Sequence, residues 1–180
     1  ATVPAADAPP FPTMQLRIHT GLDEIPAGQW DALRPDDNPF LSHAFLAGLE
    51  RTGCIRNELG WQSWHLAWYR DDRLVAALPA YLKGNSHGEF VFDWSWAQAH
   101  EIAGGRYYPK LLCAVPYTPV TGPRLLTGRQ DNVVLQRALV QSLVNETRRL
   151  GLSGVHVNFP DPAGRAVLAA DPRWLPRCDV

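Results

Sequence analysis

A long amphipathic helix is predicted from residue 131 to about residue 150, and it has the clearest pattern in the chain. Its buried stripe consists of Leu135, Leu139 and Leu143. Gly151 can end the helix, because glycine adopts the left-handed conformation of a helix C-terminus without strain. Apolar segments at residues 120–126 and 154–159 flank the helix, and we interpret both as strands. Two strands joined by a long helix predict a right-handed crossover between parallel neighbours.

The first half of the chain predicts antiparallel pairing. Residues 63–69 and 74–82 have the pattern of two strands around Arg70-Asp71-Asp72-Arg73. Because aspartate tolerates the left-handed turn conformation, these segments predict an antiparallel hairpin. Pro79 cannot donate a ladder hydrogen bond, so the second strand should be bulged or lie at a sheet edge. Residues 14–19 alternate as another short strand does.

Further elements complete a mixed fold. Helices are predicted at residues 26–33 and 38–53, and a short helix should end at Gly104-Gly105. Residues 89–94 place Phe90, Phe92 and Trp94 on one face and Glu89, Val91 and Asp93 on the other, which predicts a strand. A further strand is predicted at residues 111–115. The order of elements predicts an α+β fold. It would have a mixed central sheet with an antiparallel hairpin and a parallel β-α-β crossover, flanked by helices.

The composition excludes several classes of protein. A formal net charge of −1 gives no basis for a surface built on bulk positive charge, so no DNA partner is expected. No apolar run approaches the ~20 residues that a membrane span requires. Three scattered cysteines form no C-x-x-C pair, which favours reduced thiols and a cytoplasmic location. Of the 17 basic residues, two are lysines, Lys83 and Lys110.

The chain has the length of one ordinary domain. Residues 1–13 are rich in Ala and Pro and lack the basic start and long apolar segment of a secretory signal. We therefore expect them to be a disordered leader. Met14 lies directly at the first predicted strand, so one domain is predicted at residues 14–180.

Several segments resemble one bacterial family. They are 38–43 (Asn-Pro-Phe-Leu-Ser-His), 81–84 (Tyr-Leu-Lys-Gly), 89–94 (Glu-Phe-Val-Phe-Asp-Trp), 106–112 (Arg-Tyr-Tyr-Pro-Lys-Leu-Leu) and 115–124 (Val-Pro-Tyr-Thr-Pro-Val-Thr-Gly-Pro-Arg). With these segments, residues 14–180 resemble predicted N-acyltransferases that are also described as peptidoglycan biosynthesis/recognition proteins and are related to the Fem peptidyltransferases. The order of elements resembles a GNAT-like lobe, in which two central parallel strands splay apart to admit substrate.

The resemblance implies transfer of an acyl or aminoacyl group to an amine, without a covalent enzyme intermediate. The acceptor would be a small molecule or a peptidoglycan precursor, and the donor would be acyl-coenzyme A or aminoacyl-tRNA. Proteins of this kind carry two GNAT-like lobes, so this chain would be the N-terminal lobe, truncated before a second lobe that is its partner. The alternative is a non-catalytic GNAT-like module that binds the acceptor or a partner.

The loop before the long helix departs from the GNAT pattern. The family pattern there is Q/R-x-x-G-x-G/A, whereas residues 126–131 are Leu-Thr-Gly-Arg-Gln-Asp, with one glycine. A helix N-terminus still offers free N–H groups to an anion. The missing glycine nevertheless predicts that this lobe holds no cofactor.

Glu89 and Asp93 are the candidate catalytic residues. On one face of a predicted strand, their Cα atoms should lie about 13 Å apart, which is too far for a shared proton. Either could act alone as a general base, because N-acyl transfer requires a deprotonated amine and a buried carboxylate with a raised pKa can accept that proton. The alternative is an exposed strand face on which Asp93 helps to start the next helix.

A second group of candidates binds substrate. Arg106 and Lys110 could hold phosphate or carboxylate through charge-assisted hydrogen bonds. Tyr108, Tyr117 and Thr118 could bond to a carbonyl or to a leaving group. The alternative is a loop stiffened by proline, with packed tyrosines.

No metal site is expected. The nearest grouping consists of His87, Glu89, Asp93 and His100, which lack H-x-x-x-H or H-E-x-x-H spacing. His43 and His156 are expected to be structural.

Overall fold

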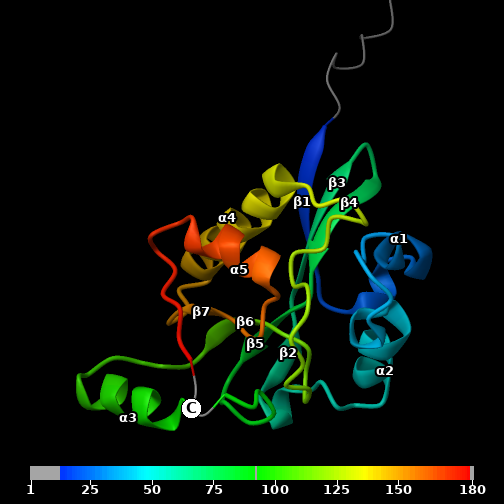
Figure 1. The fold of residues 1–180 in the computed structure, drawn as a ribbon. Coiled ribbons are helices and arrows are strands. Elements are labelled where there is room, and N and C mark those ends of the chain that lie inside the picture. Colours follow the sequence, from blue (N-terminus) through cyan, green and yellow to red (C-terminus); the bar gives the residue numbers. More distant parts are fainter. Residues whose placement is uncertain (1–12, 92, 179–180) are drawn as a thin grey trace, which may run out of the picture.

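The computed structural model describes residues 13–91 and 93–178, and Figure 1 shows the arrangement of its strands and helices. The strands are β1 (Met14–His19), β2 (Trp61–Ser63), β3 (His65–Arg70), β4 (Arg73–Leu78), β5 (Ala80–Lys83), β6 (Lys110–Cys113) and β7 (Val155–Val157). The helices are α1 (Ala27–Asp31), α2 (His43–Arg51), α3 (Trp94–Ile102), α4 (Val133–Arg149) and α5 (Pro162–Ala169). Single 3-10 turns lie at Leu22–Glu24, Pro39–Leu41 and Asn57–Leu59. The predicted α+β class is confirmed.

The strands form two sheets rather than the single central sheet that the sequence predicts. The first sheet has the order β1-β3-β4 and is antiparallel. The second has the order β2-β5-β6-β7, and its strands pair antiparallel except for β6 and β7, which are parallel. The expected mixture of directions therefore lies within the second sheet.

The predicted hairpin connects the two sheets. Asp71 and Asp72 form its turn with φ angles of 47° and 64°, which is the left-handed conformation expected of aspartate. Trp64 separates β2 from β3, and Pro79 separates β4 from β5, so both arms of the hairpin pass from one sheet to the other at this level. Trp64 N donates to Ala80 O (2.8 Å) and keeps the arms together there. The irregularity predicted at Pro79 is confirmed.

The parallel β-α-β crossover is present, but its first strand is not the predicted one. β6 and β7 are the parallel neighbours, and α4 lies between them in the chain. Residues 120–126 form isolated bridges instead of a strand, one between Gly122 and Pro160 and one between Leu126 and Ala77. Pro123 lies inside this segment and has no N–H to donate, which interrupts a ladder.

The predicted strand at residues 89–94 is wrong. Phe90 has a φ of 55°, which an extended strand does not adopt. α3 begins at Trp94, with Asp93 as its N-cap residue. The alternation in the sequence instead separates the buried Glu89 and Asp93 from the exposed Phe90 and Trp94.

Helices flank the sheets, with α1 and α2 on one side and α4 and α5 on the other (Figure 1). α4 confirms the long predicted helix, and Leu139 and Leu143 of its stripe are fully buried. Two tryptophans attach α4 to the hairpin. Trp64 Nε1 donates to Glu146 Oε1 (2.8 Å), and Trp68 Nε1 donates to Ser142 Oγ (3.1 Å). In the described chain, no helix combines the length and the apolarity that crossing a membrane requires.

The predicted leader lies almost entirely outside the described residues. Thr13 is described, and it is bonded to the hairpin turn. Its N–H donates to Asp71 Oδ1 (3.1 Å), and its carbonyl accepts from Asp71 N (3.3 Å). The last residue of the predicted leader is therefore paired with the hairpin turn.

Candidate functional site

Two lysines mark the place where polar side chains gather. Lys83 ends β5 and Lys110 begins β6, and they are directly paired across the antiparallel ladder. They are the two lysines of the sequence, and both are fully buried. Residues directly opposite in a ladder point to the same face of the sheet. Because lysine is almost never fully buried without a partner, this face requires acceptors for two ammonium groups.

Lys110 lies at the centre of a group that we call the Lys110 cluster. Its Nζ donates to Asp93 Oδ2 (2.8 Å) and forms an ion pair with Glu89 Oε2 (3.1 Å). The same ammonium donates to Ser86 Oγ (3.4 Å) and to His156 Nδ1 (3.5 Å). Two acids and a hydroxyl from the segment after β5 thus meet a lysine of β6 and a histidine of β7.

Two tyrosines lie over this cluster. Tyr107 OH donates to Asp93 Oδ2 (2.7 Å), and the Tyr108 hydroxyl bonds to that of Ser86. The centroids of the Tyr107 and Tyr108 rings lie 5.1 and 5.5 Å from Lys110 Nζ. The negative face of an aromatic ring attracts an ammonium group, so both rings help to hold the buried charge.

The two carboxylates differ in their affinity for a proton. Burial alone would raise the pKa of Asp93, but hydrogen bonds, above all that from Lys110, outweigh it and lower that pKa. Burial raises the pKa of Glu89, although Lys110 opposes the shift. Among the residues that the structure describes, Glu89 Oε1 and Asp93 Oδ1 are buried without a hydrogen-bond donor, whereas Glu89 Oε2 faces the Lys110 ammonium at 3.1 Å. Paired groups with diverging pKa values are typical of acid–base sites.

Burial lowers the pKa of two basic groups at the cluster. Lys83 Nζ donates to His87 O (3.0 Å) and lies 3.6 Å from the centroid of the Trp61 ring. Burial lowers the pKa of Lys83 to about 8, and Lys110 acts in the same direction. Burial, again with Lys110, lowers the pKa of His156 to about 4. His156 is therefore neutral at pH 7, and its Nδ1 lone pair is free to accept from Lys110.

A protein-family model matches residues 21–180, and its description is FemAB-like, peptidoglycan biosynthesis/recognition. The chain belongs to the FemAB-like family. The resemblance that the sequence motifs indicate is therefore confirmed, and all the motif segments lie within the matched region. No curated protein matches the chain.

In this FemAB-like chain, the structure brings four of the predicted site residues together. Glu89, Asp93 and Lys110 belong to the cluster, and Tyr108 contacts it through a hydroxyl. The extended strand from which the separation of the Glu89 and Asp93 Cα atoms is predicted is not present in the described part of the chain. A carboxylate oxygen of Glu89 and one of Asp93 lie within 4.8 Å of each other, because the chain turns at Phe90 instead of continuing as a strand.

Three other predicted residues lie outside the Lys110 cluster. Arg106 is exposed. Tyr117 OH donates to Cys54 O (2.9 Å) and attaches its loop to the segment after α2, whereas Thr118 Oγ1 donates to Pro116 O (3.1 Å) within the loop. Their role in substrate binding stays a prediction.

The site also has members that sequence reasoning did not select. Ser86 and Lys83 were not singled out, and His156 was expected to be structural. The rarity of lysine in the sequence was the available signal for Lys83. The contact between His156 and Lys110 joins residues 46 positions apart, and no local pattern marks it.

A potential metal-ligand group occurs here, and it differs from the one considered in the sequence. Glu89, Asp93 and His156 hold three possible ligand atoms within 4.8 Å of one another. Lys110 Nζ lies 2.8, 3.1 and 3.5 Å from an oxygen of Asp93, an oxygen of Glu89 and His156 Nδ1. The ammonium of Lys110 thus supplies the positive charge at this position.

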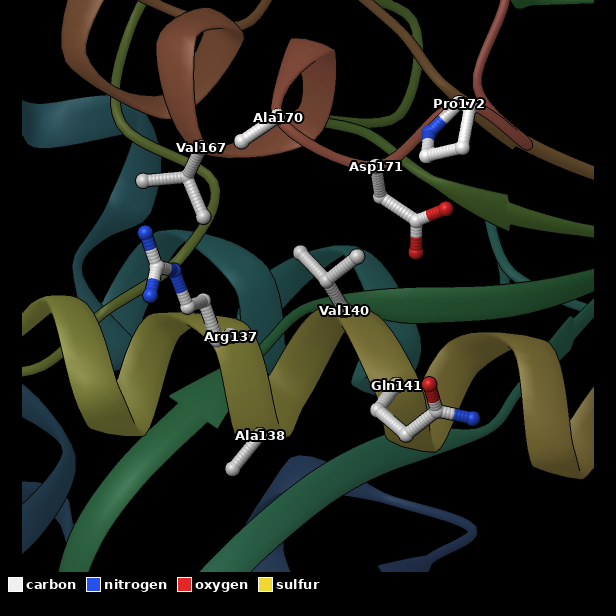
Figure 2. Close-up of a pocket in the computed structure, with 8 residues that line it drawn as sticks. All are labelled: Arg137, Ala138, Val140, Gln141, Val167, Ala170, Asp171 and Pro172. Carbon is white, nitrogen blue, oxygen red and sulfur yellow. The ribbon is translucent and has the colours of Figure 1, made fainter.

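Two hollows lie elsewhere on the described surface. Figure 2 shows the first, an open groove of about 610 Å³ between α4 and the segment 167–172. Its apolar residues include Val140 and Val167, and its carboxylate, Asp171, already pairs with Arg173. The second, of about 450 Å³, is lined by residues that include Glu50 and Ser63. Neither is lined by a residue of the Lys110 cluster, so the concentration of charge and not a hollow identifies the candidate site.

Stability is expected to rise between about pH 4 and pH 6.5 because of His156. Above pH about 4 this side chain is neutral in the fold, whereas in the unfolded chain it binds a proton up to its usual pKa near 6.5. The unfolded state binds more protons in this window, so raising the pH favours the fold, and the gain is complete above pH 6.5. Allowing for the partly exposed ring, the gain should be about 2 kcal/mol.

Urea unfolding of the wild type and of His156→Asn at the two ends of this window measures the effect. Asparagine keeps an acceptor near Lys110 but does not titrate. The rise in the free energy of unfolding across this pH window should therefore be smaller in the variant, and the difference is the contribution of His156. If the free energy of unfolding rises equally in both proteins, titratable groups other than His156 cause the rise.

Proposed function

We propose that this chain is one lobe of an N-acyltransferase that moves an acyl or aminoacyl group to an amine. The acceptor is a small molecule or a peptidoglycan precursor, and the donor is acyl-coenzyme A or aminoacyl-tRNA. A second GNAT-like lobe of the same protein completes the cleft, and the reaction takes place in the cytoplasm. Membership of the FemAB-like family supports the proposal. The observation that carries it is the buried Glu89 carboxylate, whose Oε1 has no hydrogen-bond donor in the described chain.

Glu89 is the proposed general base. An acceptor amine is protonated at neutral pH and must lose a proton before it attacks. Burial raises the pKa of Glu89, which makes it a stronger base than an ordinary glutamate. The proton passes from the ammonium to Glu89, and the nitrogen lone pair forms a bond to the acyl carbon. The carbon–sulfur or carbon–oxygen bond of the donor then breaks, and the leaving group takes up the second proton, which the attacking nitrogen loses as the amide forms.

Asp93 and Lys110 are the proposed positioning residues for this base. Asp93 is held by Lys110 and Tyr107, and its pKa is lowered, so it stays ionised beside Glu89. Its free oxygen, Oδ1, can accept an N–H of the incoming ammonium while Glu89 accepts another. An amine held by two carboxylates has a defined direction of attack, and such orientation contributes strongly to rate.

The start of α4 supports a donor site outside this lobe. Gly128 N donates to Leu33 O (2.8 Å), and Asn132 N donates to Thr127 Oγ1 (3.2 Å). Leu135 N donates to the side chain of Asn132 (3.1 Å). Each of these three amides already has a partner within the lobe, so none of the three is available to a pyrophosphate group.

A non-catalytic module that holds the acceptor is the second candidate. Its support is the burial of the cluster, because Glu89 is 3% and Lys110 0% exposed. A closed cluster must open before it can contact any substrate. The two candidates make different predictions for the effect of Glu89 on rate.

Replacing Glu89 by glutamine in the full-length protein is expected to slow transfer about a hundredfold. Glutamine has the shape of glutamate but cannot accept the proton of the amine. The measurement is the steady-state rate with acyl-coenzyme A or aminoacyl-tRNA as donor and an amine as acceptor. This lobe alone is expected to be inactive, because one wall of a cleft cannot fix both reactants. Asp93→Asn, Lys110→Ala and Tyr108→Phe extend the series, with smaller losses expected for the tyrosine.

Glu146→Gln is the matched control for this series. It makes the same change at a buried acid of α4, which bonds to Trp64 and Arg149 far along the chain from the cluster. The control should keep the wild-type rate, and circular dichroism should show that each variant is folded. A folded Glu89→Gln enzyme with the wild-type rate would remove Glu89 as the base and favour the non-catalytic module.

A further inference from the structure

The connection between β5 and β6 has an inverted burial pattern. It comprises residues 84–109, of which the structure describes 84–91 and 93–109. In that described part, the buried residues are Ser86, Glu89 and Asp93, and all three are polar. Four of its large apolar side chains are exposed, namely Phe90 (49%), Trp94 (53%), Trp96 (56%) and Ile102 (80%), whereas the rings of Tyr107 and Tyr108 are half-buried beside Lys110. The connection therefore buries charge and leaves its apolar surface outside, which is the reverse of ordinary packing.

The helix within this connection has little to hold it in place. None of the nine residues of α3 is buried, and Figure 1 shows α3 standing apart from the sheets and the other helices. An isolated helix of this length has little stability in water, because most helical stability comes from a packed face. After α3, Gly104 has a φ of 82°, a conformation that glycine adopts readily. Glycine, whose backbone is the least restricted, therefore lies where the helix ends.

Polar contacts attach the connection to the sheet. Lys110 on β6 contacts Glu89 (3.1 Å) and Asp93 (2.8 Å), and Lys83 on β5 donates to His87 O (3.0 Å). Trp61 Nε1 on β2 also donates to His87 O (3.1 Å). Each of these partners can bond to water when the contact breaks. Separation would therefore uncover mainly charged and polar groups, together with the ring of Trp61, which packs against Gly88.

We propose that the β5–β6 connection is a flap, with Lys110 as its latch, which lifts from the sheet and opens the Lys110 cluster to a ligand. The identity of that ligand rests on the proposed function, but the motion follows from the burial pattern. Hydration of Glu89, Asp93 and Lys110 offsets the loss of their ion pairs on opening. The denaturant dependence of an opening reaction scales with the surface that it exposes, so this opening should depend weakly on urea.

Chemical modification of Lys110 reports the opening. The sequence has two lysines, so a small amine-reactive reagent has two side-chain targets, and mass spectrometry can quantify each one. In the wild type, Lys110 should react well before global unfolding, at a rate that is nearly constant at low urea. Hydrogen exchange of α4 in the same samples gives the rate of global opening. If Lys110 reacts only with the urea dependence of α4, the connection is a fixed part of the fold and the proposal is wrong.

Asp93→Asn tests the latch itself. The neutral amide weakens a charge-assisted hydrogen bond from Lys110, so modification of Lys110 should become about tenfold faster. Glu146→Gln makes the same change outside the connection and should leave that rate unchanged. An unchanged rate in Asp93→Asn, or an equal increase in both variants, would contradict the role of Lys110 as the latch.

Neither measurement needs a substrate, so the two proposals can fail separately. A mobile flap in an enzyme whose rate is insensitive to Glu89 would count against the proposed function alone. A fixed connection in an enzyme that depends on Glu89 would count against the flap alone.

Discussion

Replacing Glu50 by alanine is expected to lower the free energy of unfolding by about 3–5 kcal/mol. Glu50 lies on α2, and its carboxylate accepts three hydrogen bonds, from Leu22 N (2.7 Å), Ser63 Oγ (2.5 Å) and His65 Nε2 (2.7 Å). His65 is fully buried, and its Nδ1 accepts from Ala80 N (3.3 Å), so Nε2 is the nitrogen that donates. Alanine leaves these three donors without their acceptor. Because the donors belong to the segment after β1, to β2 and to β3, their loss should loosen several elements together.

Urea unfolding at about pH 7 measures the loss, and Glu58→Ala is the matched control. Glu58 is an exposed acid that lines the same surface hollow as Glu50. Its removal should therefore change the free energy of unfolding by no more than about 0.5 kcal/mol. Burial alone would raise the pKa of Glu50, but hydrogen bonds from His65, Ser63 and Leu22 outweigh burial, so the pKa is lowered. The contribution of the carboxylate is therefore present above the usual pKa of glutamate and is lost as the pH falls through the lowered value. A loss below about 1 kcal/mol at pH 7, or one that does not shrink in acid, would show that these bonds contribute little.

The elements that the sequence predicts correctly are those specified by local patterns. α4 has a long apolar stripe, a capping side chain in Asn132 and a stop at Gly151. The β3–β4 hairpin has two aspartates at the positions that need a left-handed backbone. In both cases the residues that decide the structure lie within one turn or one helix of each other, so a single sequence contains the necessary information.

The wrong strands arise where a local pattern has a cause outside the segment. Residues 89–94 alternate because Lys110 requires two buried acids, and no apolar face of a sheet is involved. Residues 120–126 contain strand-forming side chains, yet Pro123 interrupts the ladder, and the segment forms single bridges to β4 at Ala77 and to the loop after β7 at Pro160. The division into two sheets was likewise not predicted, because it depends on how both arms of the hairpin bend at Trp64 and Pro79.

At the candidate site, the sequence indicates several of the residues that take part but not the contacts between them. Glu89, Asp93 and Lys110 were selected as individual residues, because buried carboxylates and a rare lysine suit proton transfer and ligand binding. Their contact was not predicted, since it requires a turn at Phe90. His156 is expected from the sequence to be structural. Its contact with Lys110 could not be predicted, because that contact depends on the parallel pairing of β6 with β7.

Replacing Arg124 by methionine is expected to lower the free energy of unfolding by about 3 kcal/mol. Arg124 is fully buried, and its guanidinium donates to three carbonyl groups, those of Asn158 (3.0 Å), Val120 (2.6 Å) and Pro123 (3.2 Å). Burial lowers its pKa, and in the described chain no carboxylate forms an ion pair with it. Its contribution therefore comes from hydrogen bonds that join the loop after β6 to the end of β7. Methionine fills much of the volume but leaves the three carbonyls without a donor.

Arg124→Lys separates the geometry of these bonds from the charge. Lysine keeps the positive charge, but its ammonium is compact and lacks the planar fork that reaches three carbonyls at once. We therefore expect the lysine variant to lose nearly as much stability as the methionine variant in urea unfolding. A lysine variant as stable as the wild type would show that charge alone is sufficient. A methionine variant as stable as the wild type would show that the cost of burying the guanidinium cancels its hydrogen bonds, and that another contact holds the carboxyl ends of β6 and β7 together.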